Sequence, residues 1–233
     1  MVTALLAPLV ATLVAGSFAT ALGRQWRARR RDHALAWTLS LLMFAGGTLA
    51  IALGIAGGWS RANFSTYWLL GALLVVPLLA VGQLHLMAPK LSVLWWTFGG
   101  LFGAWAIYTL LSSPVDPAVL AAVDTAGGIP RGADVFGEDS LTMALLPVSN
   151  YTAAVVVLGS VWSGMRTKRY GILLIALGVV LAGGSFVFVR IGQGELVSVF
   201  LALGVSLMYA GFVAAGRPSR RVAFTERPAP SRV

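Results

Sequence analysis

The sequence predicts an all-α protein that crosses a membrane seven times as a helical bundle. Hydrophobic residues make up 58% of its 233 residues, charged residues only 11%, and the mean hydropathy is +0.85. Ordinary soluble domains do not approach these values. The apolar runs are continuous rather than alternating, which excludes a transmembrane β-barrel. The chain has no cysteine, which excludes a disulfide-rich secreted fold.

Seven apolar segments are long enough to cross a bilayer, since a helical span needs about 20 residues. Backbone groups in lipid must pair within their own segment, so each span is expected to be a helix. The spans are 3–23, 34–57, 66–88, 92–112, 141–162, 170–190 and 195–215. The first is interpreted as a span rather than a cleaved signal peptide, because no basic cluster precedes it. The chain then divides into a bundle over 1–216 and a basic tail over 217–233, which we expect to be cytoplasmic and disordered.

The charges sort to opposite sides of this bundle. Basic residues gather in 24–31, at Lys90, in 166–169 and in the tail, whereas the loop 113–140 is acidic. Cytoplasmic loops carry the excess of basic residues, so the N-terminus is predicted outside and the C-terminus inside. The same sorting explains the net charge of +9 without nucleic acid. The expected partners of the basic inner face are membrane lipids with anionic headgroups.

The outer loop 113–140 is the one connection with room for structure of its own. Pro117 and the residues up to Val123 predict a short helix, with Asp116 as its cap. We expect the loop as a whole to form a solvated lid over the outer mouth of the bundle.

An internal repeat is suggested by two similar motifs. Ala45 to Thr48 (Ala-Gly-Gly-Thr) in the second span resembles Ala182 to Ser185 (Ala-Gly-Gly-Ser) in the sixth, and Pro8 corresponds to Pro147. The first three and the last three spans would then be parallel copies joined by the fourth, a 3+1+3 repeat. The alternative is that small residues simply recur where helices pack closely.

The middle of the predicted spans contains no Asp, Glu, Lys or Arg. Proton pumps and ion-coupled transporters need such residues, as does a retinal protein, so these classes are disfavoured. The most polar patch in a span is Ser149, Asn150, Tyr151 and Thr152, shortly after Pro147. A proline leaves a carbonyl without its donor, and these side chains could bind a neutral solute there. The alternative is hydrogen bonding between helices; in both cases Asn150 should point into the bundle.

Three further residues are candidates for lining such a solute site. They are Gln83, His85 and Tyr108. We interpret His85 as hydrogen-bonded at the inner interface or as a proton carrier. Haem ligation together with His33 is disfavoured because neither histidine has a helical partner at metal-binding spacing. We therefore expect no metal and no cofactor.

Two pairs of residues predict contacts between helices. Arg190 and Glu195 lie at the outer ends of the last two spans, and we expect them to form an ion pair that fixes this hairpin. Gly99 and Gly103 lie one helical turn apart, a spacing that lets helices approach closely. They would suit packing within the bundle or a homo-oligomer.

The segments from Tyr67 to Ala72 and from Pro147 to Asn150, with Pro77 and Gly82, resemble uncharacterised multi-pass membrane proteins of actinobacterial type. The resemblance implies a bacterial cytoplasmic membrane, as does the predominance of arginine among the basic residues, and it implies no activity. No hydrolytic, metal or nucleotide-binding constellation is present, so we expect no enzyme. The first functional hypothesis is a non-enzymatic membrane component that binds lipid or a membrane protein partner. The second is a small transporter or facilitator for a neutral polar solute.

Overall fold

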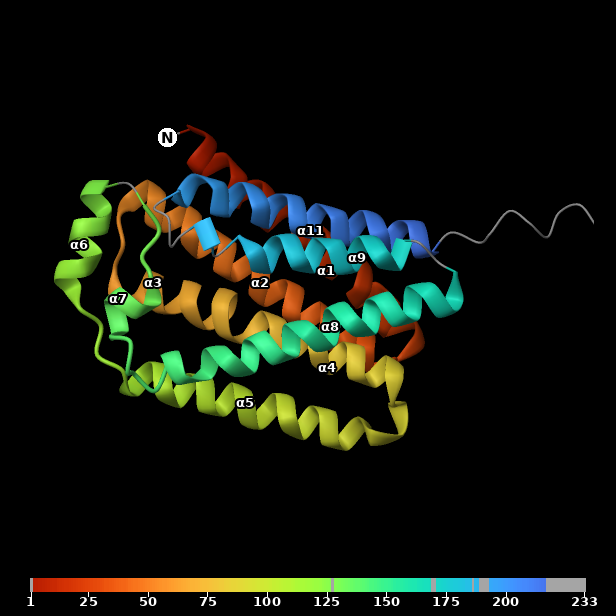
Figure 1. Ribbon diagram of the computed structural model, residues 1–233. Coiled ribbons are helices and arrows are strands. Elements are labelled where there is room, and N and C mark those ends of the chain that lie inside the picture. The colour runs from red at the N-terminus through yellow and green to blue at the C-terminus, as the bar shows by residue number, and fades with distance from the viewer. Residues whose placement is uncertain (1, 127, 169–170, 186, 189–192, 217–233) are drawn as a thin grey trace, which may run out of the picture.

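The computed structural model describes residues 2–126, 128–168, 171–185, 187–188 and 193–216 (Figure 1). The regular elements in these ranges are helices, which confirms the predicted all-α fold. The long helices are α1 (Val2–Arg29), α2 (Asp32–Gly57), α4 (Val75–Met87), α5 (Ser92–Ser112), α8 (Leu146–Thr167), α9 (Gly171–Gly184) and α11 (Gly194–Gly216). The predicted tail over 217–233 lies outside the described residues.

Six of the described helical segments are long and apolar enough to cross a membrane. They are Ala4–Arg29, Asp32–Gly57, Arg61–Met87, Pro89–Ser112, Met143–Thr167 and Leu196–Ala215. The predicted span 170–190 corresponds to α9, which has 14 residues and is therefore about 21 Å long. That is shorter than the hydrocarbon core of about 30 Å. The structure therefore supports a helical membrane protein without establishing the seventh span.

The segment Arg61–Met87 is continuous but changes its helix type twice. It begins as α3 (Arg61–Thr66). The Ser60 side chain caps its first turn by accepting a hydrogen bond from the backbone N–H of Asn63 at 3.1 Å. It continues as a π-helix over Tyr67–Leu74 and then as α4. Pro77 follows closely, and its ring would clash with the carbonyl four residues earlier in a regular helix. The wider π turn gives that carbonyl room.

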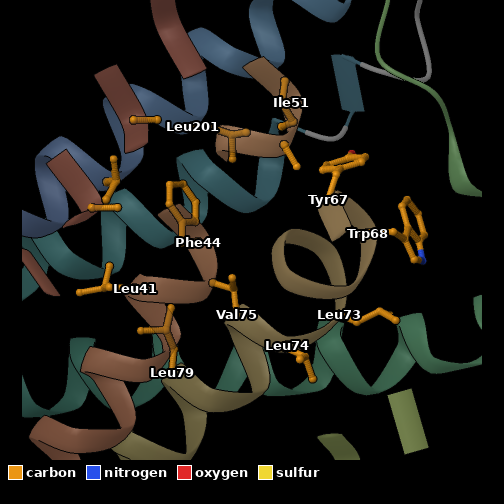
Figure 2. Packing of buried hydrophobic residues seen from close by; sticks show 14 of the residues in the cluster. Leu41, Phe44, Ile51, Tyr67, Trp68, Leu73, Leu74, Val75, Leu79 and Leu201 are labelled. Atoms are coloured by element: carbon orange, nitrogen blue, oxygen red, sulfur yellow. The ribbon is translucent and has the colours of Figure 1, made fainter. Parts of the chain in front are cut away.

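Six of the described helices form a ring through their successive contacts. In order around it come α1, α2, α4, α8, α9 and α11, and α11 contacts α1 to close the circle. The interior is filled by one cluster of buried hydrophobic residues, part of which Figure 2 shows. Leu41 and Phe44 of α2, Leu79 of α4 and Leu201 of α11 belong to this cluster. The ring is thus a packed core rather than an open channel.

Two buried hydrogen bonds join α2 to α4 directly. The Ser40 hydroxyl donates to the Val75 carbonyl at 2.6 Å, and the Trp37 indole donates to the Leu79 carbonyl at 3.0 Å. Where α2 passes the π-helix, Gly47 lies against Gly71, and a Cβ on Gly47 would approach the Gly71 Cα to 2.7 Å. Glycine is therefore required for this close approach.

The helix α5 lies outside the ring, where it contacts α4 and the π-helix. Its Gly99 faces α4, since a Cβ there would lie 3.3 Å from the Val81 side chain. This contact agrees with packing inside the bundle rather than with a glycine face free for a homo-oligomer. The other faces of α5 expose large apolar side chains such as Leu101 and Leu111, as expected for a helix surrounded by lipid.

The predicted outer loop folds back onto the bundle as α6 (Pro117–Ala126) and α7 (Gly132–Phe136). The Ala118 amide donates to the Asp116 carboxylate at 2.8 Å, which confirms the predicted cap. The segment is solvated only in part, in contrast to the fully solvated lid that we expected. Phe136 is buried against Trp68, with ring centroids 5.9 Å apart, and Gly132 lies so close to Trp68 that a Cβ would collide with its ring. Apolar burial therefore holds this segment in place.

The motifs that suggested a repeat are not packed alike. Gly47 lies against Gly71, whereas a Cβ on Gly183 or Gly184 would meet no described heavy atom within 4 Å. Pro8 is buried and Pro147 is exposed. The repeat is therefore not confirmed at the level of these residues.

Candidate functional site

The predicted polar patch at the start of α8 does not form a site. Ser149 is buried, but Asn150 is exposed and Tyr151 is 76% exposed. The prediction that Asn150 points into the bundle is wrong. The inward face of α8 contains Thr152, Val156 and Ser160, and this spacing leaves Asn150 on the opposite side. Tyr108 is also 65% exposed, on α5.

The proline before this patch has a different role from the one predicted. Pro147 is in the first turn of α8, which begins at Leu146. Amides in a first turn have no partner within the helix, so the missing N–H leaves no interior carbonyl without its donor. Of the two polar groups that do face inward, the Thr152 hydroxyl donates to its own helix, and no described residue pairs with the Ser149 hydroxyl. There is no gap in the backbone hydrogen bonding for a solute to fill.

Gln83 does lie inside the ring, next to a central cavity of about 10 Å³. All six ring helices line this cavity. The lining residues are Phe18, Leu22, Trp37, Leu41, Leu79, Gln83, Val156, Ser160, Ile175 and Met208. The Gln83 side chain is 3% exposed, and among the described residues no hydrogen bond to its amide is found. A cavity of this size holds about one water molecule.

Gln83 is held in place by a glycine of the neighbouring helix. A Cβ on Gly159 of α8 would lie 2.6 Å from the Gln83 amide nitrogen. The absence of a side chain at position 159 therefore makes the space that the amide occupies between α4 and α8.

His85 lies two residues further along α4 and is buried in a chain of polar contacts. Its Nδ1 is 2.7 Å from the Val81 carbonyl oxygen, and its Nε2 is 3.2 Å from the Ser92 hydroxyl of α5. The Ser92 hydroxyl donates to the Asp32 carboxylate of α2 at 2.5 Å. His85 Nε2 and the same carboxylate oxygen are 3.8 Å apart. Three helices thus meet at one hydrogen-bonded group.

Sequence reasoning identified His85 but missed both of its partners. In the sequence, Asp32 directly follows the basic run 24–31, and Ser92 is only the first residue of the predicted span 92–112. Asp32 and Ser92 begin α2 and α5, and His85 is near the C-terminal end of α4, so all three lie at the same end of the bundle. This shared end is the signal in the sequence that could have connected them. His33 has a separate position, with its ring 5.7 Å from that of Trp37.

The turns between α1 and α2 and between α4 and α5 lie at the same end of the ring as the last turn of α8 (Figure 1). All three carry basic residues, and we call this end the basic end. These residues are exposed, and they are Arg24, Arg27, Arg29, Arg30 and Arg31 between α1 and α2, Lys90 between α4 and α5, and Arg166 and Lys168 at the end of α8. The opposite end holds α6 and α7 with Asp116 and Asp134. This segregation matches the charge sorting predicted from the sequence.

A groove of about 410 Å³ lies between α1 and α11. Its lining is almost entirely apolar and consists of Val14, Ser206, Tyr209, Ala210, Val213 and Ala214. The Ser206 hydroxyl donates to the Ala202 carbonyl at 2.7 Å, so it is already paired within its own helix. The groove therefore offers an apolar surface to a ligand.

The predicted pair of Arg190 and Glu195 is not tested. Arg190 and the Glu195 side chain lie outside the described part of the chain. Among the described residues, no group of three His, Cys, Asp or Glu side chains is placed to hold a metal ion.

Comparison with known proteins gives no relative. No protein-family model, curated protein or solved structure matches this chain. The resemblance to actinobacterial multi-pass proteins therefore stays a prediction, and the function must be argued from the chain itself.

Proposed function

We propose that this protein is a non-enzymatic component of a bacterial cytoplasmic membrane that binds anionic lipid at its basic end, in the groove between α1 and α11. The observation that carries the proposal is that Val14, which lines this apolar groove, lies on the same helix, α1, whose last turns carry exposed arginines. The proposal includes the orientation predicted from the charge distribution, in which the N-terminus is outside and both the basic end and the tail are on the cytoplasmic side.

The dimensions of the groove suit one acyl chain of the inner leaflet. Val14 lines it, and Arg24 follows ten residues later on α1, a rise of about 15 Å. That distance equals half of the roughly 30 Å hydrocarbon core. An α-helix turns by about 100° per residue, so Arg24 and Arg29 point to opposite sides of the direction in which Val14 points from the axis of α1. An acyl chain in the groove would therefore place its phosphate between two guanidinium groups.

The order of helices in the ring supports the 3+1+3 plan as part of this proposal. Two consecutive sets of three helices follow one another around the circle, α1, α2 and α4 and then α8, α9 and α11. The fourth predicted span, α5, stands outside. Two parallel copies related by a rotation about the membrane normal would give this order, with α9 as part of the sixth span.

A facilitator for a neutral polar solute is the alternative, and one observation favours it. The Gln83 amide lies beside the central cavity with no described hydrogen-bond partner, so it could bind a solute. Because the cavity has room for about one water molecule, passage would require the ring helices to separate. The lipid proposal requires no such opening.

The lipid proposal is tested by native mass spectrometry of the full chain in vesicles that contain phosphatidylglycerol and phosphatidylcholine. The double variant Arg24→Gln with Arg29→Gln should reduce retained phosphatidylglycerol at least about fivefold, because two charge-assisted contacts are lost. Ala210→Trp should do the same by filling the groove. Leu101→Trp, on the lipid-exposed face of α5, is the matched control and should change nothing. Equal retention in all four proteins would contradict the proposal.

A further inference from the structure

The contacts of the Ser92 hydroxyl require more protons than the hydroxyl itself supplies. Ser92 has one hydroxyl proton, which it donates to Asp32 at 2.5 Å. His85 Nδ1 faces the Val81 carbonyl at 2.7 Å, and a carbonyl only accepts, so Nδ1 carries a proton. The remaining contact, 3.2 Å between His85 Nε2 and the Ser92 oxygen, is a hydrogen bond only if Nε2 carries a proton as well. The complete chain of contacts thus contains one proton beyond neutral histidine and ionised aspartate.

We propose that Asp32, Ser92 and His85 form a proton-binding site, and that the bound proton fixes the basic end of α5 to the ring. With the proton bound, the imidazolium donates to Ser92, and Ser92 donates to the Asp32 carboxylate. Without it, the single Ser92 proton serves either His85 or Asp32. One of the two links between helices is then lost.

The helix that loses this link is the one that the ring holds least. α5 lies outside the ring, and its contact with α4 runs through the small residue Gly99. At its far end, Ser113 pairs with Thr142 at 2.7 Å. At its basic end, Trp95 donates to the Ala88 carbonyl at 3.0 Å, a bond within the α4 to α5 turn. Among the described contacts, the link to Asp32 joins this end of α5 to α2.

The surroundings of His85 determine where the extra proton resides. Asp32 of α2 is 3.8 Å away with its side chain 46% exposed, so water stabilises its carboxylate and gives the proton an aqueous route. His33 of α2 opposes this proton, because the two histidines repel each other when both are charged. The Trp96 ring of α5 lies 5.4 Å away, where it can stabilise a cation. The other charged groups at the ends of the packed elements are exposed to solvent. They are Arg31 before α2, Lys90 before α5, and Arg166 and Lys168 at the end of α8.

The direction of the pH effect follows from the proton count. The bound proton stabilises the docked position of α5, so docking is complete at low pH and weakens as pH rises. This inference is independent of lipid binding.

Hydrogen exchange of the full chain in nanodiscs tests the inference. Protection of the amides of residues 96–100, corrected for the intrinsic rate, should fall about tenfold from pH 5.5 to pH 8.5, the effect of one charge-assisted hydrogen bond. His85→Gln should keep high protection at both pH values, because its amide always donates. Ser92→Ala should show low protection at both. His33→Gln removes the neighbouring histidine but leaves the three residues of the site in place, so protection should still fall as pH rises.

A second measurement does not depend on any change at the site. The chain has two histidines, so His33→Gln leaves His85 as the only imidazole, and ¹⁵N NMR reports its protons directly. Both ring nitrogens should be protonated at pH 5.5, and only Nδ1 at pH 8.5. A neutral ring at pH 5.5, a proton on Nε2 at pH 8.5, or wild-type protection that does not change with pH would overturn the proposal.

Discussion

The start of α8 and the end of α4 are both polar, but only the end of α4 places both of its candidate polar side chains inside the protein. At the start of α8, four polar residues are consecutive, so the helix distributes them around its circumference: Ser149 and Thr152 are buried, and Asn150 and Tyr151 are exposed. On α4, Gln83 and His85 are both buried, and each meets a neighbouring helix where that helix provides a gap or a partner. The density of polar residues in a sequence is therefore a weaker guide to a site than their position relative to the neighbouring helices.

Among the substitutions that test this difference between α4 and α8, the largest loss of stability is expected at the contact between the two helices. Gly159→Val places a side chain where the Gln83 amide lies, and overpacking of this kind costs about 1–3 kcal/mol. We expect a clear fall in the unfolding temperature in lipid. Gly100→Val is the matched control, since a Cβ there meets no described atom within 4 Å. Equal stability of the two variants would mean that the ring repacks around the amide freely.

A smaller effect of opposite sign is expected at Gln83 itself. Gln83→Leu removes a buried amide for which no described partner is found, and an unpaired buried polar group costs about 1–3 kcal/mol. The variant should therefore be more stable than the wild type, by about 1 kcal/mol in the free energy of unfolding. A loss of stability instead would show that the amide binds a water or a solute in the central cavity, which favours the facilitator alternative.

The smallest effect is expected at the start of α8. Asn150→Leu changes an exposed side chain, and substitutions of that kind usually stay within about 0.5 kcal/mol. Unfolding temperature and expression should match the wild type, and Tyr151→Leu should behave in the same way. If Asn150→Leu destabilised the chain strongly, a partner would have to cover this face, and the contrast with α4 would disappear.

The sequence was sufficient for features that depend on composition along one helix. The predicted span 92–112 coincides with α5 at Ser92–Ser112, and the Asp116 cap follows from local chemistry. Features that depend on two helices were not predictable. Asp32 looked like a loop charge until α5 brought Ser92 to it, and the inward face of α8 was set by packing against α4. The π-helix before Pro77 is a change of hydrogen-bond register, which apolar residues do not indicate.

Closure of the ring between α1 and α11 has a consequence for the order in which the chain assembles during synthesis. Hydrogen bonds that join α2 to α4 connect neighbouring segments, so they can form as soon as α4 leaves the ribosome and enters the bilayer. The seam that closes the ring instead joins the first helix to the last and is apolar, with Phe18 packed between Tyr209 and Phe212. Until α11 is synthesised, the part of α1 that α11 later covers contacts acyl chains of the bilayer. The residues Ala11, Ala15 and Phe18 on that face have apolar side chains. Contact with lipid therefore leaves none of them with an unpaired polar group before α11 arrives.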